Sequence, residues 1–380
     1  MSLFRGPTFA DRLTATANRP AGFDYLRLVL ASCVIVIHAF LLTLNDIDRA
    51  RPLVATVLPM FFALSGFLVC GSLVRTTSLI DFLALRVLRL LPALIVETTL
   101  SAVVIGAIFT TLPLDEYFTH PMFRGYFTSI IGVVKYKLPG VFLTNAYPEV
   151  VNGQLWTLKF ELYSYFSLAL AVLLGLVRPR IRFALVVAVG FPLFFVLGAF
   201  VFVKKPTLAV HGPVLVACFV AGVAAYLYRD RIVWSGRLFV VTLLTTIGCL
   251  ALPFGDYLIP LPVTYATVYL GLLNPYRISL VRKGDYSYGL FLYGYPIQQA
   301  TSATLGAAGF HWAINLAVAY PIAFAVAAFS WWCVERPFLK LKPLVGRLRS
   351  WGASGSSVAR ASDGAQPVER AARSSSSGLI

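Results

Sequence analysis

Three ionisable residues lie in the first long apolar stretch of the sequence, which runs from Phe23 to Phe40: Asp24, Arg27 and His38. In a helix, Asp24 and Arg27 are surface neighbours because they are three residues apart. Arg27 and His38 share one helix face, about 16.5 Å apart along the axis. Histidine changes charge near neutral pH and is the commonest general base. The spacing therefore predicts a helix with a cation near one end and a catalytic base or nucleophile near the other.

A structural role is the alternative for His38, in which another helix binds the imidazole and the pair holds a helix bundle together. A polar group that faces lipid is costly, so in both cases this face should point into the protein. Ionisable groups within membrane helices usually belong to functional sites, which favours the catalytic interpretation. For Arg27, a position near the helix end is also compatible with a side chain that extends to the membrane surface.

The composition indicates an all-α integral membrane protein. Of the 380 residues, 58% are hydrophobic and 13% are charged, whereas about a quarter of the residues of a soluble domain are charged. Apolar runs of about 20 residues are long enough to cross a bilayer as helices. We expect about ten, at 24–43, 53–74, 90–112, 155–177, 182–203, 209–228, 236–253, 258–274, 286–306 and 312–334.

The net charge of +16 indicates membrane topology rather than nucleic-acid binding. If ten runs cross, most of the Lys and Arg residues fall on one side, together with both chain ends, and positive loops stay in the cytoplasm. Both termini are therefore predicted to be cytoplasmic. No cleavable signal peptide is expected, because the first run is long enough to span and no cleavage site follows it. The five cysteines have no metal-ligand spacing and suggest no disulfide, so no metal site is expected.

The chain is predicted to form one membrane domain, 23–339, after a cytoplasmic segment, 1–22. An outer loop, 113–154, has an apolar middle that we expect to be interfacial or re-entrant, because the charge alternation would fail downstream if it spanned. The tail, 340–380, is small, polar and rich in Ser, so it is predicted to be disordered. No appended soluble catalytic domain is expected.

Two further groups of residues have spacing that fits chemistry. Arg86 and Arg89 in "RVLR" share a helix face at the entrance of the third run, where they are either ordinary cytoplasmic charge or an anion clamp. Glu161 lies about 9 Å below the outer end of the fourth run. His38 lies at a similar depth, so a His–Glu pair in the manner of a catalytic triad is predicted. The alternative is a structural ion pair of Glu161 with Lys159 or another cation.

Four residues are candidates for secondary roles in a site. Ser65 precedes Gly66 in the second run, where the glycine allows close helix packing. Trp156 fits the aromatic belt of a membrane interface, and Tyr288 fits either that belt or a site at the cytoplasmic face. Asp24 is the fourth. Glu335 and Arg336 are expected to form an ion pair that ends the last run.

In combination, these motifs resemble the membrane acyltransferase 3 family. The stretch "FDYLRLVLASCVIVIHAF" matches the opening pattern of that family, with Arg27 and His38 in their places. Five matching stretches follow in order, at 59–69, 82–93, 152–165, 284–296 and 334–338, so the resemblance covers about 23–340. One position differs from the family pattern: Gly294 stands where members often have a second histidine.

The resemblance implies a multi-pass O-acyltransferase of the bacterial inner membrane. Such proteins acylate surface polysaccharides, including exopolysaccharides, and related glycans. By resemblance, His38 is the general base or acyl relay, and Arg86 and Arg89 bind acyl-CoA, most often acetyl-CoA. Arg27 lies at the same predicted face of the membrane, so we expect it to join them at the donor. The donor is then a co-substrate, with no permanently bound cofactor, and the acceptor is a glycan or lipid-linked saccharide. The alternative function is a non-enzymatic transporter or flippase of a polar lipid or glycan, which ten helices with buried charges also fit. The sequence leaves the oligomeric state open.

Overall fold

The computed structural model describes residues 6–76, 78–201 and 207–342, and in these ranges the chain folds into a bundle of helices with only isolated β-bridges. The α-helices are α1 (Phe9–Ala15), α2 (Gly22–Leu42), α3 (Arg51–Val54), α4 (Val57–Arg75), α5 (Leu79–Thr99), α6 (Gly106–Phe109), α7 (Leu114–Thr119), α8 (Pro121–Tyr126), α9 (Leu158–Leu173), α10 (Arg180–Val196), α11 (Gly212–Leu227), α12 (Gly236–Leu250), α13 (Pro260–Gly271), α14 (Ser279–Lys283), α15 (Ser287–Leu305), α16 (Trp312–Ser330) and α17 (Arg336–Leu339). π-Helical segments at Leu100–Ile105, Leu197–Val201 and Trp331–Glu335 extend α5, α10 and α16. The prediction of an all-helical protein is confirmed.

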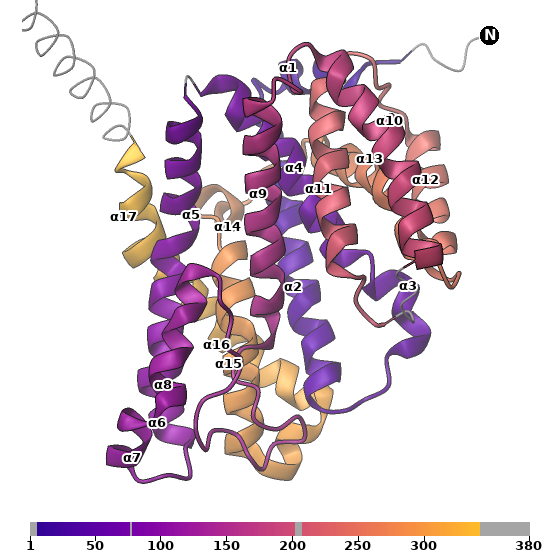
Figure 1. Cartoon of the computed structure of the whole chain (residues 1–380). Coiled ribbons are helices and arrows are strands. Elements are labelled where there is room, and N and C mark those ends of the chain that lie inside the picture. The colour runs from indigo at the N-terminus through magenta and orange to yellow at the C-terminus, as the bar shows by residue number, and fades with distance from the viewer. Residues whose placement is uncertain (1–5, 77, 202–206, 343–380) are drawn as a thin grey trace, which may run out of the picture.

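Four helical runs in the described residues are long and apolar enough to cross a membrane: Gly22–Leu42, Asp48–Arg75, Arg180–Val201 and Trp312–Leu339. Gly212–Leu227 and Gly236–Leu250 are apolar but shorter. Helices occur at each of the ten expected positions, and the number that cross and the side on which the termini lie stay predictions. The first described helix, α1, and the last, α17, lie toward the same end of the bundle, and α7 lies at the opposite end (Figure 1).

The core of the bundle is built on a close crossing of α4 and α11, next to α13 and α9. Two glycines make this crossing possible: a Cβ atom on Gly66 would lie 2.0 Å from the Phe219 carbonyl oxygen, and one on Gly222 would lie 2.2 Å from that of Ala63. Packing through Gly66, expected from the sequence, is therefore confirmed. Small residues at such crossings let helix backbones approach closely in membranes.

A second group of helices, α2, α15 and α16, packs beside this core. In Figure 1, α10 and α12 lie on one side of the bundle, and α5 and α17 lie on the other. The α10 run is only 11% buried over its most apolar window. A helix that is apolar all round and exposed on most of its surface is suited to contact with lipid.

The third expected run begins earlier than its apolar residues indicated. Ser78 caps α5 by accepting a hydrogen bond from the Ile80 backbone N–H at 3.2 Å, so the helix starts at Leu79 rather than at 90. Arg86 and Arg89 consequently lie inside α5 and not at its entrance. A charged first half hides a helix from a search for apolar runs, although capping and periodicity extend it.

The N-terminal segment, expected as 1–22, contains a helix of its own. Thr8 and Asp11 form a capping box at the start of α1. Phe9 is fully buried and packs against Tyr265 of α13, with ring centroids 5.3 Å apart. The segment is therefore part of the bundle. Of the tail expected at 340–380, residues 343–380 lie outside the described residues.

The loop expected at 113–154 is folded against the end of the bundle. It contains α7, α8 and a 3₁₀ turn, Phe127–Ile131, and then runs without regular structure to a second 3₁₀ turn, Gly153–Thr157. Gln299 of α15 donates to the Tyr147 and Val150 carbonyls at 2.8 and 2.7 Å. Asn152 donates to the buried carboxylate of Glu97. Irregular backbone is tolerated at membrane depth only where protein groups satisfy it in this way.

We predict that alanine at Gly66 or Gly222 destabilises the bundle, because the added Cβ atom meets backbone rather than a movable side chain. The expected loss is about 1–3 kcal/mol in the free energy of unfolding, which a thermal melt of the purified protein in detergent measures. Gly190 and Gly248 are matched controls, since a Cβ atom there has no neighbour within 4 Å. Equal melting temperatures for Gly66→Ala and Gly190→Ala would contradict the assigned crossing.

Candidate active site

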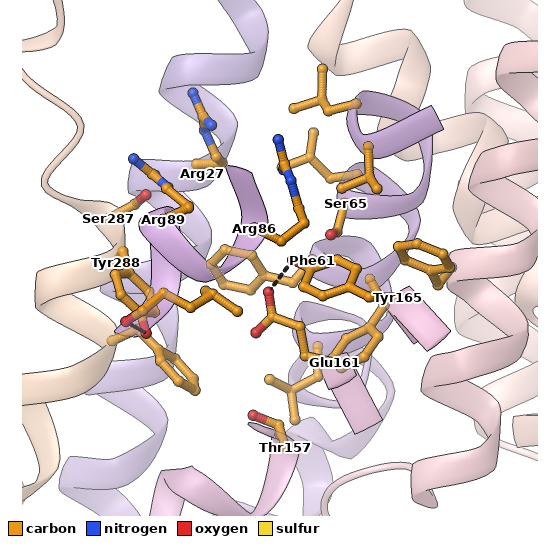
Figure 2. Close-up of a pocket in the computed structure, with 18 residues that line it drawn as sticks. Arg27, Phe61, Ser65, Arg86, Arg89, Thr157, Glu161, Tyr165, Ser287 and Tyr288 are labelled. Carbon is orange, nitrogen blue, oxygen red and sulfur yellow. Dashed lines mark hydrogen bonds between the residues drawn. The ribbon is translucent and has the colours of Figure 1, made fainter. Parts of the chain in front are cut away.

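Side chains from six α-helices surround an inner cavity of about 180 Å³. Arg27 comes from α2, Arg86 and Arg89 from α5, and Glu161 and Tyr165 from α9, while α4 and α15 supply much of the remaining wall. Figure 2 shows the three arginine side chains on one side of the cavity and Glu161 with Tyr165 across from Arg86. The structure thus brings together the three arginines that sequence reasoning grouped as an anion site.

A chain of ion pairs crosses one wall of the inner cavity. Asp285 contacts Arg89 at 2.5 Å and Arg27 at 3.3 Å, and Arg27 also contacts Asp24 at 2.7 Å. The Ser287 hydroxyl donates to the other oxygen of Asp285 at 2.6 Å. Asp285 therefore neutralises cations from two helices at once.

Arg86 has no such partner in the described residues. Its guanidinium donates to the Ser72 hydroxyl at 3.3 Å and lies 5.8 Å from the ring centroid of Phe82. The buried Nε atom makes no hydrogen bond among the described residues. Arg86 therefore supplies a positive charge that no carboxylate within 4.0 Å offsets, in a cavity where an anion would do so.

Glu161 does not pair with His38. The Tyr165 hydroxyl donates to Glu161 at 2.5 Å, and the carboxylate interacts electrostatically with Arg86 and Arg89. The expected depth was wrong because the chain already runs inside the bundle before α9 begins. Residues Gly153–Thr157 form a 3₁₀ turn there, which carries Trp156 to the depth of His38 and moves Glu161 toward the arginines. Lys159 is exposed, so the alternative ion pair of Glu161 with Lys159 is not formed either.

His38 lines a second, outer cavity of about 260 Å³ together with Gln154, Trp156 and Thr157. Tyr295 meets the imidazole edge to face, with ring centroids 5.0 Å apart. Within the described residues nothing hydrogen-bonds the ring nitrogens, so they are available to a bound molecule. The prediction that His38 points into the bundle is confirmed by its place in this cavity.

The two cavities adjoin. Leu58, Thr157 and Phe291 line both, so a partition of three side chains separates the arginine cluster from the imidazole. Arg27 at one end and His38 at the other lie on the same face of α2, about 16.5 Å apart by helical rise. The charged inner cavity and the largely apolar outer cavity therefore lie in line along α2.

The secondary candidates are distributed over both chambers. Ser65 and Tyr288 line the inner cavity, and the Tyr288 hydroxyl donates to the Leu90 carbonyl at 3.0 Å. Trp156 lines the outer cavity. Asp24 belongs to the chain of ion pairs. The expected ion pair of Glu335 and Arg336 is absent from the described contacts, because Glu335 is buried and Arg336 stacks on Trp332, 4.3 Å from its ring centroid.

The residue that stands where a second histidine occurs in the family has a packing role here. Gly294 of α15 faces α2, and a Cβ atom on it would lie 2.9 Å from Cγ1 of Ile35. Among the described residues, His38 is the histidine that lines either of these two cavities. The site therefore offers one imidazole to a reaction.

A buried ion pair that the sequence did not reveal holds the wall of the outer cavity. Arg51 of α3 donates to both carboxylate oxygens of Asp256, at 2.8 and 2.9 Å. It also donates to the Thr207 carbonyl at 2.7 Å, and Thr207 itself lines the cavity. His211 lies 4.0 Å from the same carboxylate. No motif or spacing in the sequence singled out Arg51, although its position before Pro52 at the start of a helix is a sign of order.

Tyr165 is a second residue that the sequence analysis did not identify. It lies four residues after Glu161, so the two share a helix face and the contact was visible in the spacing. Gln154 was missed as well: it donates to the Leu292 carbonyl at 2.7 Å and fixes the turn before α9.

Ionisable side chains gathered in two cavities inside an apolar helix bundle indicate a membrane protein with a candidate functional site within the bundle. Residues 21–336 match the acyltransferase domain of the acyltransferase 3 family, and the chain belongs to that family. It is therefore an acyltransferase, and the alternative of a non-enzymatic transporter is not supported.

Two curated proteins are similar to the chain along nearly their whole length. The O-acetyl transferase of Shigella phage Sf6 is 28% identical, over 83% of this chain and 95% of the phage protein. Nodulation protein 10 of Rhizobium leguminosarum bv. viciae is 30% identical, over 84% of this chain and 93% of that protein. No solved structure shows a significant match.

We predict that Arg51→Ala lowers the free energy of unfolding by about 3–5 kcal/mol, because it leaves the carboxylate of Asp256 buried without its cation. A thermal melt in detergent measures the loss. Arg49→Ala is the matched control: this arginine is exposed two residues away and should change stability by less than about 0.5 kcal/mol. If the two variants melt together, the ion pair does not hold this wall.

Proposed function

We propose that the protein is an O-acetyltransferase that moves an acetyl group from cytoplasmic acetyl-CoA to a hydroxyl of an extracytoplasmic or lipid-linked glycan. The observation that carries the proposal is the pair of adjoining cavities, with unbalanced cationic charge at one end and an accessible imidazole at the other. Membership of the acyltransferase 3 family supports acyl transfer. The phage relative, named an O-acetyl transferase, supports acetyl as the group and oxygen as the acceptor.

The inner cavity is the donor end in this proposal. Arg27, Arg86 and Arg89 bind phosphate oxygens of the donor, because guanidinium groups present paired donors in the geometry that phosphate accepts. Arg86 forms no ion pair within 4.0 Å among the described residues, so a phosphate binds it without breaking one. The slender pantetheine arm then extends along α2 and passes between Leu58, Thr157 and Phe291 into the outer cavity.

The outer cavity is the place of transfer. His38 removes the proton from the acceptor hydroxyl, and the oxygen attacks the thioester carbonyl carbon. The carbon–sulfur bond breaks, the acetyl ester forms, and the protonated imidazole of His38 returns its proton to the leaving thiolate. A two-step route through an acetyl-imidazole at His38 uses the same geometry and stays the variant of this proposal. The apolar walls exclude water, which limits hydrolysis of the thioester.

Glu161 serves the donor in this scheme rather than orienting His38. Its carboxylate faces the inner cavity and is held by Tyr165, so it can accept a hydrogen bond from an amide N–H of the pantetheine arm. The edge contact of Tyr295 fixes the plane of the imidazole in its place. Thr157 lies on the partition that both substrates must meet.

The acceptor reaches His38 from the end of the bundle that carries the folded loop 113–154. Edge-to-face contacts join Tyr117, Phe123 and Phe127 within that loop, and these rings pack into an apolar cluster that holds the loop in place. We propose that this end faces the periplasm of a bacterial cell and the arginine end faces the cytoplasm, in keeping with the positive charge of the loops at the arginine end.

We predict that His38→Ala and His38→Gln abolish acetyl transfer, with a loss of at least about 100-fold in kcat/KM, the lower bound expected for a general base. Mass spectrometry of the host's surface glycans, with and without each variant, measures the product. His311→Ala is the matched control, since His311 is exposed near the same end and lines neither cavity. Near-wild-type acetylation by a stably inserted His38→Ala protein would refute the role of this residue.

We predict that Arg86→Gln raises the KM for acetyl-CoA about tenfold, which corresponds to about 1.4 kcal/mol of binding free energy. Steady-state kinetics of the purified protein in nanodiscs gives KM and kcat separately. Arg75→Gln is the control, because Arg75 is exposed at the C-terminal end of α4 and lines neither cavity. Arg89→Gln should in addition lower the melting temperature, because it removes a cation from Asp285. An unchanged donor KM in Arg86→Gln contradicts the donor assignment.

A further inference from the structure

A third cavity, of about 180 Å³, opens beside the donor end of the bundle. Arg282, Lys283 and Gly284 line it from α14 and the turn that follows, and Trp331 lines it from the π-helical segment after α16. Asp24 and Asp285 complete the polar part of its wall. None of the steps proposed for acetyl transfer uses this cavity.

The third cavity adjoins the inner cavity across the chain of ion pairs. Asp285 lines the third cavity and contacts Arg27 and Arg89, which line the inner one. A ligand that binds these two arginines therefore lies within one side-chain layer of the third cavity. A single long anionic molecule can contact both chambers.

The two basic residues that line the third cavity form no ion pair within the described residues. Among the described residues, no carboxylate lies within 4.0 Å of Arg282 or Lys283, both of which are exposed. The indole Nε1 of Trp331 is buried and has no acceptor among the described residues. A Cβ atom on Gly284 would lie 2.6 Å from that nitrogen, so only glycine lets the turn approach the indole. The cavity thus holds two cations that form no ion pair and a free N–H donor, while the carboxylates of Asp24 and Asp285 in its wall already pair with other arginines.

We propose that this cavity binds the phosphate monoester on the ribose of coenzyme A, with Arg282 and Lys283 as its ligands. The inference rests on the proposed function, which requires an acyl-CoA donor. A phosphate monoester carries a charge of roughly −1.5 to −2 at neutral pH, and the three arginines of the inner cavity are already assigned to the other phosphates. Arginine binds such a group through paired N–H donors, and lysine binds it as a point charge.

The general excess of positive charge at this end of the bundle does not explain why Arg282 and Lys283 line a cavity. Arg231 lies in the connection between α11 and α12 and Arg237 in the first turn of α12. Both are exposed as well, and they line neither this cavity nor the inner one. Basic residues that only determine membrane topology do not have to line a cavity.

The test compares acetyl-CoA with 3′-dephospho-acetyl-CoA as donors for the purified full-length protein in nanodiscs. We expect the wild type to show a KM about tenfold higher for the dephospho donor. In the double variant Arg282→Ala, Lys283→Ala, the ratio of the two KM values should fall toward one, because the lost contacts are made only to the missing phosphate. Arg231→Ala, Arg237→Ala should keep the wild-type ratio.

Each outcome separates this inference from the proposed function. Turnover of both donors with equal KM by the wild type overturns the inference and leaves acetyl-CoA as the donor. A wild-type ratio in the Arg282, Lys283 double variant also overturns it. Absence of turnover and of CoA binding by the wild type overturns the proposed function as well. Calorimetric titration of the His38→Ala protein with CoA and with 3′-dephospho-CoA gives the same comparison without catalysis.

Discussion

The structure depends on the way in which Asp285 neutralises two arginines inside an apolar bundle. Arg27 of α2 and Arg89 of α5 meet its carboxylate, which lies in the connection between α14 and α15, so two helices and this connection converge on one charge. An unpaired charge in such surroundings is costly, and removal of one partner leaves the remaining charges buried without compensation. Phosphate oxygens offer guanidinium the same contacts that a carboxylate does. The ion pairs that let the helices close therefore also create the kind of surface on which an anionic donor can bind.

Much of the fold could be predicted because helices in contact with lipid must be apolar, and apolar runs are visible in the sequence. Apolar runs marked every major helix, and the eleven-residue interval between Arg27 and His38 placed both on one face, where the structure has them in adjoining cavities. The pairing of Arg86 with Arg89 followed from their three-residue spacing. These inferences held because each depends on the geometry of a single helix, which the sequence determines locally.

Inferences that depended on how two helices lie relative to each other were less accurate. Glu161 and His38 were matched by depth on the assumption that the fourth helix begins at the membrane surface, but a 3₁₀ turn carries the chain inward first. Arg51 and Asp256 are 205 residues apart, and no local pattern links them. The early start of α5 escaped detection because its first half is charged. Depth and long-range pairing are set by tertiary packing, which periodicity does not encode.

The partition of Leu58, Thr157 and Phe291 gives the two chambers different chemistry. Charge is concentrated on the side of the arginines, where an anionic donor gains most from binding. On the other side, apolar walls surround an imidazole whose nitrogens have no partner among the described residues. In the proposed reaction only the uncharged end of the donor needs to pass, so the phosphates keep their cations while the thioester enters a medium poor in water. A base works there on a hydroxyl without competition from solvent. One helix, α2, connects the two environments, and its length sets the reach that the donor must have.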